Sequence, residues 1–411
     1  MTNVAPAVSA GDTAWLLTAS ALVLFMTLPG LALFYGGLVR ARNLLSVFMH
    51  CFVLCCVVSV LWVIYGYSLA FAPGGPLLGG DAKLWLADVG GIVAGTHVPE
   101  GAFALFQMTF AVITPALIVG AFAERISFPF LILFAVGWLT IVYAPVAHWV
   151  WGHGWLADRG VIDFAGGIVV HTTAGVSALV CAVMVGPRRG FPDSLIPPHS
   201  PGLTMAGAGM LWFGWFGFNG GSALAAGGPA AMAILATHCA AAAAALTWMA
   251  IEWCWAGGKP TSVGIVTGSV AGLATITPAS GFVGPMGALV IGAIAGAVCF
   301  LATGFIKRGL KIDDTLDVFA VHGVGGMLGS VLVGVFTSVA FGGVGYATGM
   351  NMGAQVREQI LAVVVVALWS IVSSYVLIKL LSLVIPLRIS ADDERAGLDL
   401  ATHGERAYDH G

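Results

Sequence analysis

Long runs of apolar residues recur along this 411-residue chain, and they restrict what it can fold into. Hydrophobic residues make up 59% of the sequence and charged residues 9%, whereas about 25% of a soluble protein is charged. A helix needs about 20 apolar residues to cross a bilayer, and it satisfies its own backbone hydrogen bonds there. The sequence therefore predicts an all-α membrane protein with eleven transmembrane helices, at residues 13–37, 45–71, 102–123, 128–148, 163–186, 203–220, 229–255, 262–278, 284–306, 316–339 and 355–385.

Glycine is the second signal in the composition. There are 57 glycines, roughly twice the usual share of about 7%, and most lie inside the apolar segments. Small residues let membrane helices approach closely where no hydrophobic effect drives them together. We therefore expect a densely packed bundle. The net charge of −3 and the absence of a basic stripe argue against nucleic acid as a partner.

Lysines and arginines predict the orientation, because cytoplasmic loops are enriched in them. Only Lys83 and Arg159 lie in loops of one side, and Arg357 and Lys379 belong to the last span. The N-terminus is then expected outside and the C-terminus inside. The protein is expected to cross the inner (plasma) membrane many times. The first residues lack a positive segment, so no cleaved signal peptide is expected. Twelve basic residues lie on the other side: Arg40, Arg42, Arg125, Arg188, Arg189, Lys259, Lys307, Arg308, Lys311, Arg388, Arg395 and Arg406.

Two histidines lie inside predicted spans and have matching surroundings. His171 occurs in VVHTTAG and His322 in AVHGVGG, and Asp163 and Asp314 precede them by eight residues each. Ionisable groups at that depth are costly and point to function, although a single one often only bonds two helices together. Ten spans divide into two groups of five. Because each group has an odd number of spans, the second group lies inverted in the membrane relative to the first, which makes an inverted repeat. The histidines are then counterparts near the midplane, and the eleventh helix straps the bundle at a tilt.

Further polar and aromatic residues gather near these histidines. Asp163 begins the fifth span, where it would cap the helix or favour a cation at the outer mouth. Phe218 and Ser222 are four residues apart in WFGWFGFNGGS, and Phe106 and Phe110 are four apart in LFQMTF. Each pair therefore lies on one helix face. Spacing alone favours ordinary packing for the phenylalanines.

No metal or cofactor is expected from the sequence. Histidine and cysteine spacings do not match a zinc site, and no nucleophile with a base suggests an enzyme. The cysteines lie in or beside apolar spans and are best explained as small buried hydrophobic residues. A metal or redox role stays open for the first three of them. The seven are Cys51, Cys55, Cys56, Cys181, Cys239, Cys254 and Cys299.

Several motifs together resemble the ammonium transporter family (Amt/Mep, with the Rh proteins as distant relatives), in its bacterial Amt form. They are DFAGGIVVH, GWFGFNGGS, AERI, TPASGFVGP and DVFAVHGVGG, and the likeness runs from Thr13 to the C-terminal ERAGLDLATHGERAY. The resemblance implies a homotrimer with one pore per subunit. It implies a transmembrane domain at residues 1–385 and a cytoplasmic tail at 386–411 that packs on the cytoplasmic face, communicates between subunits and can receive a PII-type signalling protein. Composition alone describes the same tail as solvated.

The resemblance also assigns roles to residues. It implies an outer ammonium site of Trp151, Phe110 and Ser222 with Asp163 nearby, and a gate of Phe110 and Phe218 with Phe106 beside it. His171 and His322 become the twin histidines of the pore.

The chemistry of the substrate agrees with these roles. A monovalent cation moved into a medium of low dielectric constant pays on the order of 20 kcal/mol, so ammonium gains by shedding a proton and crossing as ammonia. Burial disfavours the imidazolium form, and two neutral imidazoles can relay the proton. We therefore expect ammonia and the proton to travel separately and give net ammonium uptake. An ammonium sensor acting through the tail and a passive ammonia channel stay open.

Overall fold

The computed structural model describes residues 7–194, 197–255 and 257–408. Within these ranges every named secondary-structure element is a helix. This confirms the all-α prediction. The first half of the chain forms α1 (Ala10–Phe25), η1 (Met26–Leu31), α2 (Ala32–Leu38), η2 (Ala41–Asn43), α3 (Leu44–Leu61), η3 (Trp62–Gly66), α4 (Tyr67–Phe71), η4 (Leu84–Leu86), α5 (Glu100–Phe122), α6 (Phe128–Trp138), η5 (Leu139–Tyr143), α7 (Ala144–Trp151), α8 (Trp155–Asp158), η6 (Gly167–Thr172) and α9 (Thr173–Val185).

The second half is helical in the same way. It forms α10 (Pro201–Gly221), α11 (Gly228–Cys254), α12 (Ser262–Ile276), α13 (Pro285–Gly304), η7 (Phe305–Gly309), η8 (Phe319–Val324), α14 (Gly325–Phe336), η9 (Val339–Phe341), α15 (Met352–Leu381), α16 (Ala391–Ala396) and α17 (Leu398–His403).

Every predicted span coincides with helix. In the described part of the chain, nine helices are long and apolar enough to cross a membrane. The two predicted spans outside that set correspond to α10, whose glycines and tryptophans lower its hydropathy, and α12, which has 15 residues. The chain is therefore a multi-pass membrane protein.

Two predicted boundaries differ from the observed ones by three or four residues for the same physical reason. The sequence predicts the fifth span from residue 163 and the tenth from residue 316, and helix begins at Gly167 and at Phe319. In each case an aspartate precedes the helix and accepts hydrogen bonds from its first amides. Asp163 accepts from Gly167 at 2.7 Å, and Asp314 accepts from Phe319 at 2.7 Å.

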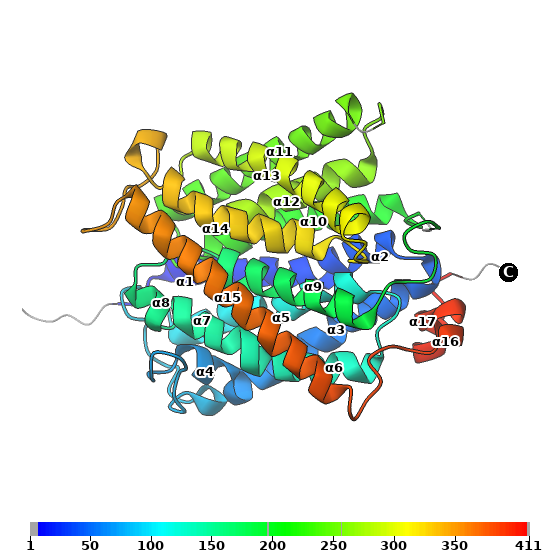
Figure 1. Ribbon diagram of the computed structural model, residues 1–411. Coiled ribbons are helices and arrows are strands. Elements are labelled where there is room, and N and C mark those ends of the chain that lie inside the picture. The colour runs from blue at the N-terminus through cyan, green and yellow to red at the C-terminus, as the bar shows by residue number, and fades with distance from the viewer. Residues whose placement is uncertain (1–6, 195–196, 256, 409–411) are drawn as a thin grey trace, which may run out of the picture.

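The helices form one bundle with α15 laid across it (Figure 1). In that view α11 to α14 lie in the upper half and α3 to α7 in the lower half. Helix α15 crosses obliquely over both and contacts α14, α9 and α6. We call the end that carries α16 and α17 the tail end, and the opposite end, with α8, the Trp151 end.

Small residues bring α11 close to its neighbours. A Cβ added to Gly292 of α13 would lie 2.2 Å from the Ala240 carbonyl oxygen, and one added to Gly272 of α12 would lie 2.5 Å from the same atom. Glycine is required at these contacts because any larger residue would separate the helices. The dense packing expected from the glycine content is confirmed at these positions.

A network of buried charges holds the tail end together. One oxygen of Glu124 accepts hydrogen bonds from the Arg40 side chain and from Asn43, each at 2.9 Å. Arg188 bridges Glu124 to Asp313, with its Nη2 atom 2.8 Å from Oδ1 of the aspartate. Burial alone raises the pKa of both acids, but the guanidinium groups outweigh it and hold each pKa below its usual range.

The C-terminal tail packs on the bundle rather than extending as a solvated segment. Asp399 accepts hydrogen bonds from the backbone amides of Leu45 and Ser46, at 3.1 and 2.8 Å, and so caps α3. The amide of Leu398 donates to Asn43 Oδ1 at 2.8 Å. Since Asn43 also binds Glu124, the tail is connected to the charge network.

Candidate functional site

The two span histidines meet in the middle of the bundle. Each lies in a π-helical turn, His171 in η6 and His322 in η8, and both side chains are buried. Their Nδ1 atoms are 3.2 Å apart, and the rings stack with centroids 5.2 Å apart and 22° between planes. The pairing that sequence symmetry predicted is therefore present.

A reciprocal glycine contact permits this approach. Gly175 and Gly326 each follow one of the histidines by four residues. A Cβ on Gly326 would lie 2.6 Å from His171 Cβ, and one on Gly175 would lie 2.1 Å from the amide nitrogen of Gly323. Each half of the molecule thus leaves room for the histidine turn of the other half.

The hydrogen bond between the rings constrains their protonation. An Nδ1···Nδ1 bond needs one nitrogen with a proton and one without, so the two rings are not both imidazolium. When both are neutral, the ring that donates through Nδ1 has an acceptor at Nε2, and its partner has an Nε2–H donor. Among the described residues, none provides a hydrogen-bond partner for the buried Nε2 of His171. The pair therefore offers one donor and one acceptor to a small polar molecule.

Aromatic rings connect this pair to the Trp151 end. Trp151 meets Phe110 edge-on with centroids 5.8 Å apart, and Phe110 stacks on Phe218 at 4.1 Å. Phe218 in turn stacks on His171 at 6.0 Å. These contacts, from helices far apart in the chain, make an unbroken column of rings from Trp151 to His322.

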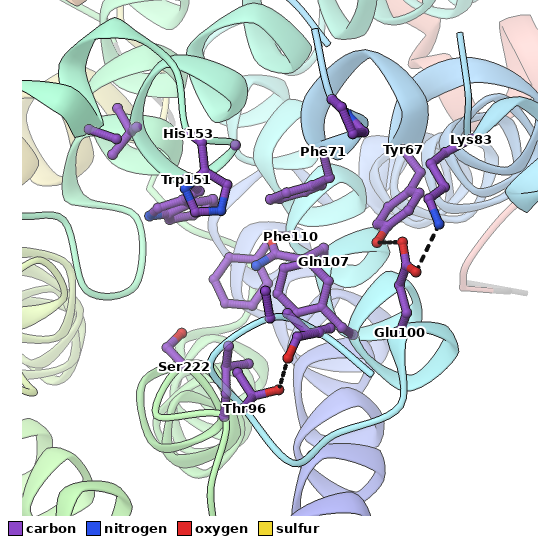
Figure 2. A pocket seen from close by; sticks show the side chains of 18 of the residues that line it. Tyr67, Phe71, Lys83, Thr96, Glu100, Gln107, Phe110, Trp151, His153 and Ser222 are labelled. Carbon is purple, nitrogen blue, oxygen red and sulfur yellow. Dashed lines mark hydrogen bonds and ion pairs between the residues drawn. The ribbon is translucent and has the colours of Figure 1, made fainter. Parts of the chain in front are cut away.

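Three cavities follow the column. The Trp151 cavity, of 590 Å³, is lined by Trp151, Phe110 and Ser222 among others (Figure 2). The central cavity, of only 10 Å³, is lined by Phe218 and both histidines, and its remaining walls are largely apolar. It is just large enough for about one water molecule.

The tail-end cavity, of 380 Å³, reaches the histidine pair from the other side and has His322 in its wall. The stacked rings of Phe110 and Phe218 separate the Trp151 cavity from the central one. The rings and the histidine pair thus lie between the two large cavities.

The other predicted site residues have clear places. Ser222 lies in the wall of the Trp151 cavity, and its hydroxyl donates to the Phe218 carbonyl at 2.9 Å. Phe106 is buried behind Phe110, with centroids 4.9 Å apart, and lines none of the three cavities.

Asp163 contacts Trp151 but does not line the Trp151 cavity. Its carboxylate accepts four backbone amides, those of residues 166 to 169, at 2.7 to 3.0 Å. Its carbonyl oxygen accepts the indole N–H of Trp151 at 2.8 Å. Asp163 therefore caps the His171 helix and orients the tryptophan at the same time.

Comparison with known proteins shows to which family the chain belongs. A sequence model described as the Ammonium Transporter Family matches residues 14–408. An ammonium transporter of Bacillus subtilis (strain 168) is 46% identical over 403 residues, which cover 97% of this chain and 98% of that protein. The chain belongs to the ammonium transporter family. Ammonium transporter Amt1 of Archaeoglobus fulgidus is 44% identical, over 97% of this chain and 100% of that protein.

Solved structures of the ammonium transporter family share the fold. A structure named "Sensor Amt Protein" superposes with a TM-score of 0.89 at 32% identity, covering 95% of this chain and 98% of that one. Mep2 of Saccharomyces cerevisiae gives a TM-score of 0.83 at 37% identity, covering 94% and 88%.

The structure also adds residues to the site of this ammonium transporter family member. Trp215 stacks on His171 with centroids 5.5 Å apart, and its indole N–H donates to Thr277 at 2.9 Å. Trp215 lies three residues before Phe218, so the two share a helix face, and this spacing could have identified Trp215 from the sequence. Tyr67, Lys83 and Glu100 line the Trp151 cavity, and Glu100 could have been noticed as the acid two residues before the third predicted span.

The cysteines do not gather into a site. All seven are free, and among the described residues no three histidine, cysteine or acidic side chains lie close enough to hold a metal ion. Cys51 is buried whereas Cys56 is exposed on the bundle surface.

Proposed function

We propose that this protein moves ammonium across the membrane by binding the cation at the Trp151 end, removing a proton, and passing ammonia and the proton separately to the tail end. The supporting observation is the column of rings and histidines that lies between the two large cavities. Its relatives are ammonium transporters, and ammonium is the proposed substrate here.

The cation is recruited at Trp151, Phe110 and Ser222. An indole face attracts a cation by about 1–2 kcal/mol when partly desolvated. The Ser222 hydroxyl uses its proton on the Phe218 carbonyl, so its oxygen lone pairs remain to accept an ammonium N–H. Asp163 contributes by holding Trp151 in place through its carbonyl oxygen.

The ammonium ion loses its proton at the phenylalanine gate, to the acceptor nitrogen of the histidine pair, whose His171 ring lies against Phe218. Beyond Phe110 and Phe218 the path narrows to the 10 Å³ central cavity, which leaves no room for a hydration shell. A bare ion there faces a desolvation cost of several kcal/mol or more, whereas ammonia does not. Potassium and sodium cannot deprotonate, and this gives selectivity. Phe106 supports the gate by packing behind Phe110.

His171 and His322 carry the proton. Ammonia can donate to the acceptor nitrogen of the pair and accept from its donor nitrogen, and a proton can exchange across the 3.2 Å contact between the rings. Charge and ammonia then recombine in the tail-end cavity.

Further parts of the proposal concern the assembly. We infer eleven transmembrane helices, a transmembrane domain at residues 1–385 and a cytoplasmic tail at 386–411. The Trp151 end faces outward in the inner (plasma) membrane. The distribution of basic residues supports this orientation. The proposed assembly is a homotrimer, with a PII-type signalling protein as the partner at the tail end.

Uptake of radiolabelled methylammonium by proteoliposomes tests the proposal. Wild-type protein takes up the label in a saturable way that ammonium inhibits, and Trp151→Leu loses high-affinity uptake while remaining folded. No saturable uptake by the wild type would contradict the transporter assignment.

A second candidate is an ammonium sensor, because a solved relative is named "Sensor Amt Protein". The tail of this chain contacts the bundle through Asp399 at the first amides of α3 and through the Leu398 amide at Asn43, and a sensor would signal through these contacts. Saturable binding without flux would favour this candidate. Uptake without current would favour a passive ammonia channel.

A further inference from the structure

A lysine ammonium group is already bound in the wall of the Trp151 cavity. Lys83 Nζ lies 2.9 Å from Glu100 Oε2, and the Tyr67 hydroxyl donates to Glu100 Oε1 at 2.9 Å. Figure 2 shows this cluster on the opposite side of the cavity from Trp151. Both charged side chains are largely shielded from solvent, with 18% and 17% exposed.

One face of α5 joins this cluster to the ring column. Glu100, Phe103, Gln107 and Phe110 follow each other at intervals of three or four residues, and all four line the Trp151 cavity. At 1.5 Å per residue the stripe is about 15 Å long. It leads from the first residue of α5 to the phenylalanine that stacks on Phe218.

The chemistry of the cluster suits a small alkylammonium or ammonium ion. A carboxylate oxygen accepts an N–H, and the hydroxyl of Tyr67 holds the other carboxylate oxygen in place. The rings of Phe71 and Phe103 line the same cavity, with centroids 5.1 Å apart. A primary ammonium group occupies this place, and it is chemically close to methylammonium.

We propose that Glu100 and Tyr67 form a second cation site in the Trp151 cavity, and that the side chain of Lys83 is its tethered occupant. A tethered group competes at an effective concentration of about millimolar or above, so dilute ammonium does not displace it. Lys83 therefore sets the apparent affinity for the transported cation by masking an attractive carboxylate. This inference rests on the proposed transport function.

A purely structural role for the pair makes a different prediction. Lys83 Nζ also donates to the Asp88 carbonyl at 2.7 Å, and its amide donates to Ser68 at 3.0 Å, so it tethers the loop before α5. If tethering were its whole function, removing the lysine would loosen the cavity wall and weaken cation binding. If Lys83 instead competes with the transported cation, removing the lysine strengthens cation binding.

The test measures KM for methylammonium uptake in proteoliposomes at low ionic strength. Lys83→Met is expected to lower KM by about threefold, in line with a partly exposed ion pair. The gain disappears in Lys83→Met/Glu100→Gln and at high salt. Arg159→Met is the matched control, because it removes a positive charge at the same end from an ion pair with Glu358 outside the cavity. Its KM stays at the wild-type value.

Several results would overturn the inference: an unchanged or higher KM in Lys83→Met, or a gain that persists in the double variant. If Lys83→Met does not fold, Glu100→Gln alone decides, because it leaves an unpaired ammonium group in the cavity and raises KM. An unchanged KM there contradicts the proposal. Failure of the wild type to take up methylammonium would instead refute the transport function, so the two failures are distinguishable.

Discussion

Gly326→Ala is the sharpest perturbation of the proposed proton relay, because it moves the histidines without removing either. The new methyl group would lie 2.6 Å from His171 Cβ and 2.8 Å from the Gly167 carbonyl oxygen. Carbon atoms in ordinary contact are about 3.5–4.0 Å apart, so the two turns must separate by about 1 Å.

That displacement breaks the contact on which the relay depends. The Nδ1 atoms move from 3.2 Å to about 4 Å, beyond hydrogen-bonding distance. Overpacking costs about 1–3 kcal/mol, and folded proteins have about 5–15 kcal/mol of stability, so the variant stays folded. A misplacement of about 1 Å can reduce a reaction rate by up to about a hundredfold.

The assay is ammonium-dependent current on a solid-supported membrane. We expect Gly326→Ala to reduce the current by about tenfold or more, with an unchanged elution profile in size-exclusion chromatography. Gly209→Ala on α10 is the control, because an added Cβ there meets nothing within 4 Å. Wild-type current from folded Gly326→Ala protein would refute the argument that the His171–His322 contact carries the proton.

Three further predictions follow from the same geometry. Phe218→Ala removes the ring between Phe110 and His171, so a potassium current should appear that the wild type lacks; continued exclusion of potassium would show that the ring is not the barrier. Asp163→Ala leaves four backbone amides without their acceptor, and losing one cap costs about 1 kcal/mol; the melting temperature should fall and uptake should weaken, unlike Asp163→Asn, which keeps part of the cap. Glu124 has a pKa held below its usual range of about 4.3, so its stabilisation is present above that pH and is lost as pH falls through its folded pKa. Thermal melts should therefore show Glu124→Gln less stable than the wild type at pH 7, by a gap that narrows near pH 3.5; an equal gap at both would contradict this.

The helices and the central pair were predictable because their signals are local. The thickness of a bilayer sets the length of an apolar span, so a helix lies in each predicted range. The repeated sequence around His171 and His322 predicted their pairing. The fifth helix begins four residues after the predicted start because hydropathy does not distinguish a capping residue such as Asp163, which precedes the helix, from a residue inside it. That signal was present in the sequence as an acid followed by glycines.

The walls of the cavities depend on contacts between distant segments. Lys83, Glu100 and Tyr67 come from a loop and two helices, and no spacing relates them. Trp215 could have been found, because it shares a helix face with Phe218. The packed tail could not be predicted from composition, since its docking depends on the fit of Asp399 to the first amides of α3.

The central claim, that ammonia and a proton cross separately, is tested most directly by recording current and methylammonium uptake on the same proteoliposomes. The wild type should give a saturable inward current that accompanies uptake and persists without a potassium gradient. His171→Ala and His322→Ala should lose the coupling between the two. Full uptake with no current in the wild type would contradict the account.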